Sequence, residues 1–263
     1  MSKFVTLSSG SSGNCSFIEH KGVKILIDAG FSGKKIEGLM AKVGEKASDL
    51  DAIFLTHEHN DHVQGAGVLS KRFNIPIYAN AGTWKGFSKK AKKLKEENIK
   101  IFKTNEFLNF KSMDILPIAI HHDANEPCGY VFYLGNKKVT ILSDTGLVDE
   151  KMAYEIKGSD IYYMEANHDL EALKIGPYPY NLKLRVMGNM GHLSNDQSAE
   201  ALADALVGKE EYVFLSHLSD TNNTPELSRL TVDNYLTKMG LDTNKDIKLE
   251  VCERYEPSKI VEL

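Results

Sequence analysis

The chain is organised around the stretch His57-Glu58-His59-Asn60-Asp61-His62. It places four potential metal ligands within six residues, directly after the apolar run 52–56. Imidazole and carboxylate groups suit zinc, manganese or iron, and no thiolate is present to favour a closed structural zinc site. His57 and His59 can reach one ion from an extended loop, while Asp61 and His62 begin the next turn and can reach a second. The alternative is a polar loop with solvated histidines, but the combination of ligand types predicts a metal site.

Length and composition limit the class of protein. The 263 residues are 42% hydrophobic and 26% charged, which suits one layered α/β domain over residues 1–263. With 32 Lys and Arg against 36 Asp and Glu, the net charge is −4, so any contact with nucleic acid must use a local patch. Three widely spaced cysteines favour a reducing compartment over a disulfide framework. Because the sequence has neither an apolar leader nor a run of about 18 apolar residues, we expect a cytoplasmic protein that does not enter a membrane.

Short apolar runs recur along the chain, and a polar side chain follows each one. The runs are rich in β-branched residues and bounded by turn residues, so they predict buried strands. The residues that follow them are Asp28, His57, His121 and His122, Asp144, Glu165 and His217. Six strand ends with ligand chemistry predict one shared site at the edge of packed sheets.

Helices are expected between these strands, at residues 65–73, 85–98, 197–207 and 224–239. Residues 197–207 have the apolar spacing of an amphipathic helix, and residues 224–239 begin with residues suited to a first helical turn. Strands that alternate with outer helices predict two sheets packed face to face and covered by helices. No internal repeat or linker divides the chain.

Two further stretches carry open alternatives. The run Ser8–Asn14 is rich in Ser and Gly, so it is either a loop whose backbone approaches an anion or a plain flexible loop. Six lysines fall within eleven residues, and they either attract a phosphodiester backbone or form a solvated helix face. They are Lys85, Lys89, Lys90, Lys92, Lys93 and Lys95.

Taken in order, these motifs resemble the metallo-β-lactamase superfamily, which implies an α/β protein with an αββα four-layer sandwich and a site along one sheet edge. The resemblance also implies the ligands. One metal is expected on His57, His59 and His122, and the other on Asp61, His62 and His217, with Asp144 bridging the two and Asp28 bracing the histidine loop. His121 stays the rival of His122, because alternation along a strand cannot decide between adjacent residues.

Finer features narrow the resemblance within the superfamily. Asp at position 144, where one class of β-lactamases carries Cys, favours a dinuclear hydrolase. Residues 164–168 and 191–194 resemble elements of tRNA 3′-processing nucleases, in which a Glu–His pair assists proton transfer, although Gly-His-Leu-Ser stands here in place of His-Ser-Thr. The expected catalytic residues are therefore Asp61, Glu165 and His192, the last two from this resemblance. The 8–15 loop, residues 143–146 and residues 191–195 together look most like the WalJ/YycJ/VicX group of bacterial DNA exonucleases.

The expected function is a dinuclear phosphodiesterase with two divalent ions, Zn²⁺ or Mn²⁺, whose bridging hydroxide attacks DNA. By resemblance it is an exonuclease acting 5′ to 3′ on double-stranded DNA. The alternatives are a small-molecule hydrolase of the glyoxalase or lactonase type, an RNA-processing nuclease, and a metal-binding regulatory partner. The candidate substrate contacts are Ser11, Ser12, Asn14, His168, Lys183 and Arg185. The sequence predicts no particular oligomeric state.

Overall fold

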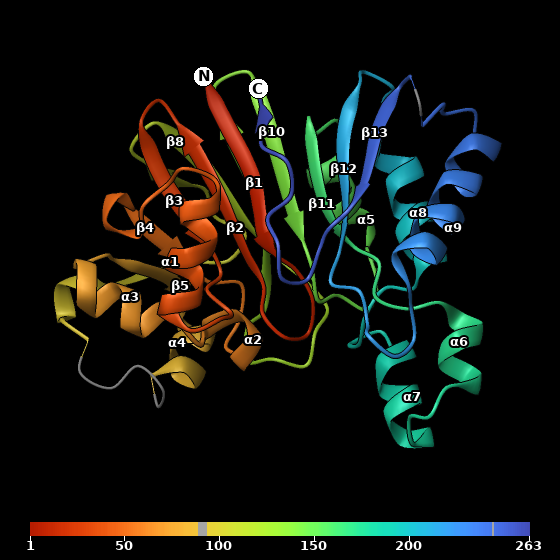
Figure 1. Cartoon of the computed structure of the whole chain (residues 1–263), viewed down its shortest axis with the longest axis horizontal. Helices are drawn as coiled ribbons and strands as arrows, with labels where there is room; N and C mark the ends of the chain where they lie inside the picture. Colours follow the sequence, from red (N-terminus) through yellow and green to blue (C-terminus); the bar gives the residue numbers. More distant parts are fainter. Residues whose placement is uncertain (89–93, 244) are drawn as a thin grey trace. The chain divides into compact units, whose positions relative to one another are not determined.

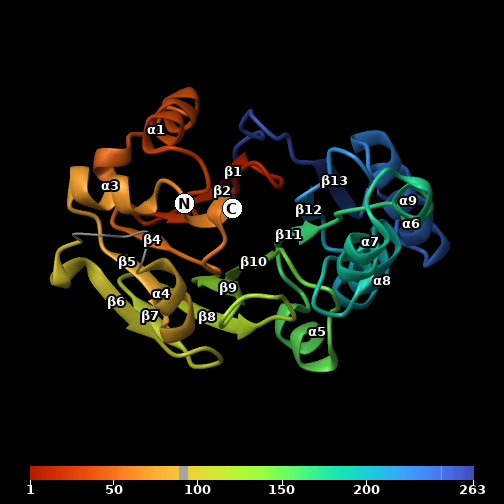
Figure 2. The same cartoon turned by 90° about the horizontal axis from the view of Figure 1, so that it is seen from below.

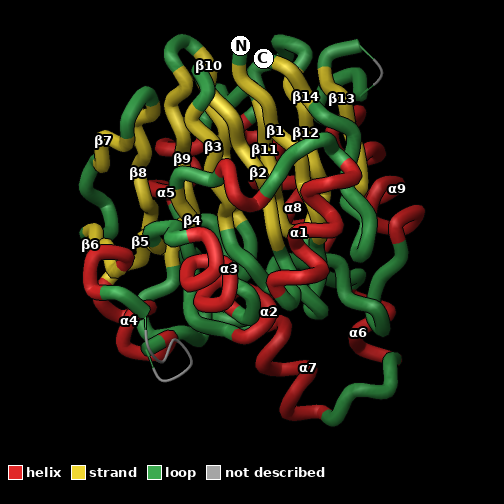
Figure 3. Tube along the Cα trace, turned by 60° about the vertical axis from the view of Figure 1, so that its left-hand side comes forward, coloured by secondary structure: helices red, strands yellow, loops and turns green. Residues whose placement is uncertain are grey.

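The computed structural model describes residues 1–88, 94–243 and 245–263, which form two compact units. The first unit contains residues 1–117, 124–128 and 252–263, and the second contains residues 118–123 and 129–251. Each unit combines β-strands, yellow in Figure 3, with helices in red. The protein is therefore of the predicted α/β class, with two mixed sheets.

The sheet of the first unit has the strand order β14-β1-β2-β3-β4-β5-β6, and Figure 1 labels its strands β1 to β5. Its strands are β1 (Ser2–Ser8), β2 (Cys15–His20), β3 (Val23–Ile27), β4 (Ala52–Phe54), β5 (Ile77–Asn80), β6 (Ile99–Phe102) and β14 (Val261–Glu262). Strands β14 to β3 pair antiparallel, and β3 to β6 pair parallel. The β2–β3 hairpin turns at Lys21 and Gly22, whose φ angles of 50° and 79° suit a two-residue turn. Strands β7 (Leu108–Phe110) and β8 (Met113–Ala119) also pair antiparallel with each other.

One face of this sheet is buried by three helices. They are α1 (Gly33–Lys42), α3 (Ala66–Phe73) and α4 (Ala81–Phe87), and shorter helical turns lie at η1 (Ala47–Asp49), α2 (Asn60–Val63) and η2 (Glu96–Asn98). Ile36, Leu69 and Trp84 bring one side chain from each helix into the core that Phe17 and Ile53 supply from the sheet. Because this packing fixes α3 and α4 on the strands, it also fixes the loop that joins β4 to α2.

The second unit contains a strand order of β13-β12-β11-β10-β9. The strands are β9 (Cys128–Leu134), β10 (Lys137–Leu142), β11 (Ile161–Glu165), β12 (Glu211–Ser216) and β13 (Ile247–Val251), and β10 to β13 run parallel. The helices are α5 (Glu150–Ile156), α6 (Leu170–Ile175), α7 (Tyr180–Met187), α8 (Asn195–Ala205) and α9 (Pro225–Lys238). Helix α9 contacts both α8 and β13, and the three lie side by side in Figure 2.

Most of the expected helices are confirmed, and one is wrong. The 65–73 and 224–239 predictions match α3 and α9, and α8 begins two residues before the expected start, where Ser194 forms a capping box with Gln197. The 85–98 helix does not exist as predicted. Helix α4 starts at Ala81 because Asn80 caps it, and it ends at Phe87, while η2 covers only Glu96–Asn98. Lys89, Lys90, Lys92 and Lys93 lie outside the described residues.

Parallel pairing explains why the polar strand ends gather within each unit. The carboxyl ends of parallel neighbours meet at one sheet edge, so Asp28 after β3 lies near Thr56 after β4. In the second unit, the same pairing brings Asp144, Glu165 and His217 together at the ends of β10, β11 and β12. Within the described ranges, no helix is both long enough and apolar enough to cross a bilayer.

Candidate functional site

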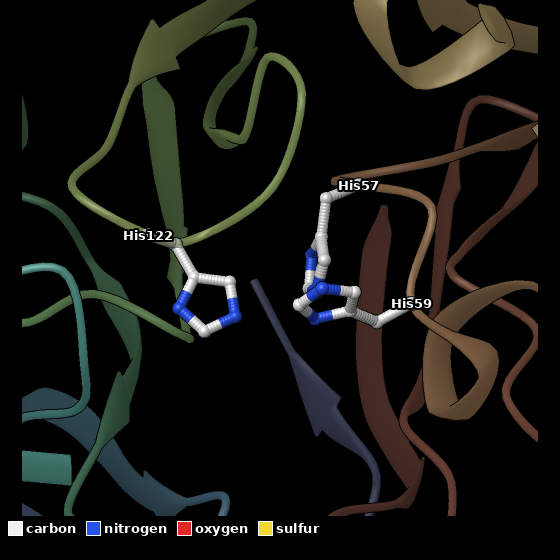
Figure 4. A group of neighbouring side chains, drawn as sticks. All are labelled: His57, His59 and His122. Atoms are coloured by element: carbon white, nitrogen blue, oxygen red, sulfur yellow. The ribbon is translucent and has the colours of Figure 1, made fainter. Parts of the chain in front are cut away.

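The histidine loop of the first unit follows β4 and runs into α2. His57 and His62 are buried, and their ring centroids are 4.1 Å apart. The His57 and His59 rings meet edge to face at 4.6 Å, and Figure 4 shows both side chains on this loop. With three imidazoles this close, the ring nitrogen that carries the proton must be fixed in each histidine, because two N–H groups or two lone pairs would otherwise face each other.

Asp28 provides that arrangement from the end of β3. Its carboxylate is buried and accepts the Thr56 N–H at 2.9 Å, the Thr56 hydroxyl at 2.8 Å and His62 Nδ1–H at 2.7 Å. Burial raises the pKa of Asp28, and the neighbouring His62 and Thr56 oppose that rise. Asp28 is thus the centre of a hydrogen-bonded network under the histidine loop.

This network selects the tautomers of the two buried histidines. The Thr56 hydroxyl donates its proton to Asp28, so it accepts the Nδ1–H of His57 at 3.0 Å. His62 likewise donates from Nδ1. A neutral imidazole that is protonated at Nδ1 carries its lone pair on Nε2. Nε2 is therefore the ligand atom that both residues offer, and such hydrogen-bonded imidazoles suit a divalent metal.

A second cluster of ligand side chains lies in the second unit. Asp144, Glu165, His192 and His217 each offer a ligand atom within 4.8 Å of the others. Glu165 is fully buried, and its Oε1 accepts from His192 Nδ1 at 2.7 Å and from His217 Nδ1 at 2.8 Å. Its Oε2 accepts the Thr145 N–H at 2.9 Å. Because Nδ1 of His217 is held in this way, His217 also presents Nε2 as its ligand atom.

The electrostatics of this cluster favour a charged pair. Burial by itself raises the pKa of Glu165, but His192 and His217 outweigh burial, and the resulting pKa lies below its ordinary value. The pKa of His192 moves the other way: burial lowers it, and Glu165 outweighs burial and raises it. Glu165 therefore stabilises a protonated His192, which is the form that can donate a proton.

His121 and His122 differ in environment as well as in position. His122 is buried and its Nδ1 donates to the Gly191 carbonyl at 3.2 Å; Figure 4 shows its ring. His121 is half-exposed, and its Nε2 lies 2.8 Å from Asp149. His122 thus shares the pattern of the other ligand candidates, with Nδ1 on a protein acceptor, whereas His121 is paired with a carboxylate through Nε2.

Backbone conformation singles out three of the strand-end residues. Asp28, Asp144 and His217 adopt positive φ angles of 59°, 56° and 53°. Such angles cost free energy for residues other than glycine and gather at functional sites. At His217 the Asn167 amide donates to the backbone carbonyl at 2.9 Å and supports this conformation.

The other predicted contact residues are spread over both units. In the first, Asn14 is buried and its Nδ2 lies 3.1 Å from His62 Nε2, while Ser11 is exposed and Ser12 half-buried. In the second, His168 is fully buried. Lys183 donates to the Lys174 carbonyl, and Arg185 pairs with Asp123 at 2.6 Å. The structure thus groups Asn14 with the histidine loop, and the remaining assignments stay predictions.

Sequence reasoning missed several supporting residues. Thr56 was treated only as part of an apolar run, although its hydroxyl bonds to Asp28 and lies 3.0 Å from His57 Nδ1 and 3.2 Å from His62 Nδ1. Gly30 was given no role, yet a Cβ there would lie 1.8 Å from the Asp61 carbonyl. The position of each beside a motif residue was the available signal. Asn167 left no signal, because its contact with His217 spans 50 residues of sequence.

Part of the lysine-rich stretch lies beside the histidine loop. Glu58 Oε1 accepts the Asn125 N–H at 2.9 Å, and a Cβ on Gly86 of α4 would lie 2.3 Å from Glu58 Cγ. Helix α4 therefore packs directly on the loop, with Lys85 exposed on it. The role of the lysines in guiding a phosphate backbone stays a prediction.

Comparison with known proteins decides the family. The model of the metallo-beta-lactamase superfamily matches residues 9–217. The chain belongs to the metallo-β-lactamase superfamily. It is 41% identical to exodeoxyribonuclease WalJ of Streptococcus pneumoniae, over 94% of this chain and 93% of that protein. It is 34% identical to exodeoxyribonuclease YycJ of Bacillus anthracis, over 98% and 97%.

Solved structures agree on the metallo-β-lactamase fold. YhfI from Bacillus subtilis, a metallo-beta-lactamase fold protein, matches with a TM-score of 0.74 at 15% identity and full coverage of both chains. The short form of human tRNase Z matches with a TM-score of 0.66, also at 15% identity, over 99% of this chain and all of that one. The predicted family and fold are confirmed, and the His and Asp clusters are those of a metal-dependent hydrolase that takes divalent ions.

Proposed function

We propose that this protein is a dinuclear metal-dependent exodeoxyribonuclease. The observation that carries the proposal is 41% and 34% identity, over nearly the whole chain, to two exodeoxyribonucleases. The buried His and carboxylate clusters support it, because each imidazole with an assigned tautomer presents Nε2. We extend the proposal to double-stranded DNA degraded from 5′ to 3′, as the family resemblance of the sequence implies.

We assign the ligands by the family pattern. By this pattern His57, His59 and His122 would hold one metal and Asp61, His62 and His217 the other, and Asp144 would be a ligand of both. The donors are imidazole and carboxylate, which suit Zn²⁺ or Mn²⁺. The three cysteines are buried, so the donor set includes no exposed thiolate. When bound, two such ions supply an activated water and neutralise charge that develops on the phosphate.

The protein's own residues supply orientation and a proton. Asp28 and Thr56 hold the buried histidines of the loop in the Nδ1–H tautomer. Glu165 orients His217 and raises the pKa of His192 at the same time. We assign His192 the role of general acid, which donates its proton to the leaving oxygen as the phosphodiester bond breaks.

The test is an assay of metal-loaded protein on duplexes labelled at the 5′ or the 3′ end. We expect stepwise loss of mononucleotides from duplex DNA, starting at the 5′ terminus. Single-stranded DNA, RNA and a glutathione thioester are run in parallel. Asp144→Asn should abolish the DNA activity, whereas Asp149→Asn, at a helix cap in the same unit, should retain it. Thioester cleavage with no action on either nucleic acid would contradict the proposal.

A further inference from the structure

A second group of polar and aromatic side chains lies in the first unit, on segments far apart in sequence. The C-terminal segment, blue in Figures 1 and 2, runs beside the β1–β2 turn, where the Ser9 N–H donates to the Glu253 carbonyl at 3.2 Å. Arg254 Nη1 then lies 3.4 Å from the Ser11 hydroxyl. Gly10 has a φ of 132°, and a Cβ there would lie 2.9 Å from the same guanidinium nitrogen. A side chain at Gly10 would displace the Arg254 guanidinium from its present position on the turn.

Aromatic rings and a lysine complete the group. The Lys35 ammonium at the start of α1 is 3.7 Å from the Phe31 ring centroid and 4.2 Å from that of Tyr255. The Tyr255 hydroxyl lies 3.4 Å from the Ser12 hydroxyl. Phe31 is buried, but Tyr255 is 51% exposed. We call Ser11, Ser12, Lys35, Arg254 and Tyr255 the Arg254 platform.

Asn14 connects the Arg254 platform to the histidine loop. Its side-chain oxygen accepts the Gly10 N–H at 2.8 Å, and its Nδ2 lies 3.1 Å from His62 Nε2. Its backbone N–H donates to the Asp61 carbonyl at 2.8 Å, and its carbonyl accepts the Gly30 N–H at 2.9 Å. The turn from residue 10 to residue 14 therefore reaches from Arg254 to a proposed metal ligand within one rigidly bonded segment.

The charge and chemistry of the Arg254 platform suit a nucleic-acid strand. Arg254 and Lys35 bring two positive charges, and the nearby Glu256 is neutralised by Lys42 at 2.6 Å. Hydroxyl groups and a guanidinium are common phosphate contacts, and an exposed aromatic ring stacks on unpaired bases. Cation–π packing alone explains why Lys35 is held, but it leaves the exposed Tyr255 face and the Ser11 hydroxyl without a role.

We propose that the Arg254 platform binds the single strand next to the cleaved bond. Arg254 and Ser11 contact one phosphate, Lys35 contacts a neighbouring phosphate, and Tyr255 stacks on an unpaired base. The inference rests on the proposed nuclease function and adds the substrate class, a frayed or single-stranded DNA end. None of these side chains touches the reacting atoms, so they are positioning residues.

The test measures binding and turnover separately. Metal-loaded protein is titrated into a fluorescein-labelled 12-nucleotide phosphorothioate strand at several salt concentrations, with wild type, Arg254→Gln and Tyr255→Ala. Lys46→Gln and Tyr154→Ala are matched controls, because both residues are exposed and lie outside the Arg254 platform. A strand with 2-aminopurine near its 5′ end reports stacking, and hydrolysis of bis(p-nitrophenyl) phosphate reports the metal centre alone.

We expect each platform variant to weaken strand binding on the order of 10-fold. Arg254→Gln should also lower the log–log salt slope by about 0.7, and Tyr255→Ala should lose the 2-aminopurine quenching. KM for DNA should rise while the small phosphodiester is hydrolysed as by wild type. Wild-type-like binding by both variants, in an enzyme that degrades DNA, would overturn the inference. So would equal losses on DNA and on the small phosphodiester, which indicate a damaged fold. A wild-type enzyme without action on DNA would instead overturn the proposed function.

Discussion

Replacing Asp28 by Asn tests the network under the histidine loop. Asn adopts positive φ as readily as Asp, so the backbone angle of 59° is tolerated. The change keeps one acceptor oxygen and converts the other into an NH₂ group. If the remaining oxygen still accepts the Thr56 N–H, the NH₂ group meets two donors, the Thr56 hydroxyl and His62 Nδ1–H.

The cost of that conflict can be estimated from the contacts. A buried donor without an acceptor costs about 1–3 kcal/mol. His62 can avoid the conflict by moving its proton to Nε2, but Nε2 is then no longer a ligand. Either way the metal site that includes His62 is weakened. Loss of a partner that orients a ligand typically lowers metal affinity about 10–100-fold, which corresponds to about 1.4–2.7 kcal/mol.

The assay is a Zn²⁺ titration of metal-free protein against a fluorescent chelator. We expect Asp28→Asn to weaken one of two binding steps by about 10–100-fold. Asp51→Asn is the matched control, because Asp51 also accepts a backbone N–H, from Lys24 at 2.8 Å, at the far end of β4 from the histidine loop. Circular dichroism and urea unfolding of the metal-free variants check the fold. Unchanged Zn²⁺ affinity at both steps in a folded Asp28→Asn protein would refute the tautomer argument.

Three other predictions follow from single contacts. His192→Ala should keep its metal content and lose about 10²–10⁴-fold in DNA turnover; loss of metal, measured by elemental analysis, would make His192 a ligand. Burial lowers the pKa of His168 to about 4, from the ordinary 6.5. Between these two pH values, His168 is therefore protonated in the unfolded chain and neutral in the native chain. Because of this proton, the free energy of unfolding of metal-free protein should fall by about 3 kcal/mol between pH 6.5 and pH 4. This contribution should be absent from His168→Gln. The same change of unfolding free energy with pH in both proteins, measured by urea unfolding, would contradict the prediction. Gly30→Ala places a methyl group against the Asp61 carbonyl and should destabilise the protein by about 1–3 kcal/mol. Gly38→Ala is the control, because Gly38 in α1 has open space around it, and it should stabilise the protein by about 0.5–1 kcal/mol. Similar Tm values for the two variants would show that Gly30 is not constrained.

Much of the site was accessible from sequence because its residues stand at strand ends. Asp28, Asp144, Glu165 and His217 each follow an apolar run, and parallel pairing within a unit brings such ends to one edge. Local patterns sufficed for these residues and for the well-capped helices α8 and α9. The family resemblance then supplied the ligand assignment, which stays a prediction, whereas the family and the fold are confirmed.

What sequence could not provide depends on contacts between distant segments. Arg254 lies on Gly10 after 244 residues of chain, and nothing in either stretch announces that contact. Glu165 was expected to orient His192, but its second hydrogen bond, to His217, needs the β11–β12 register. The prediction took the lysine stretch as a single helix from 85 to 98, whereas Asn80 caps α4 at its start and the helix ends at Phe87. The prediction of one domain over residues 1–263 stays a prediction.

Counting the metal ions bound per chain tests the dinuclear mechanism. Protein purified with excess Zn²⁺ or Mn²⁺, desalted and analysed by plasma mass spectrometry should approach two ions per chain, and DNA turnover should rise with the second ion. Asp144→Asn should bind fewer ions and lose turnover together. A wild-type protein that degrades DNA at full rate with one ion per chain would contradict the dinuclear account.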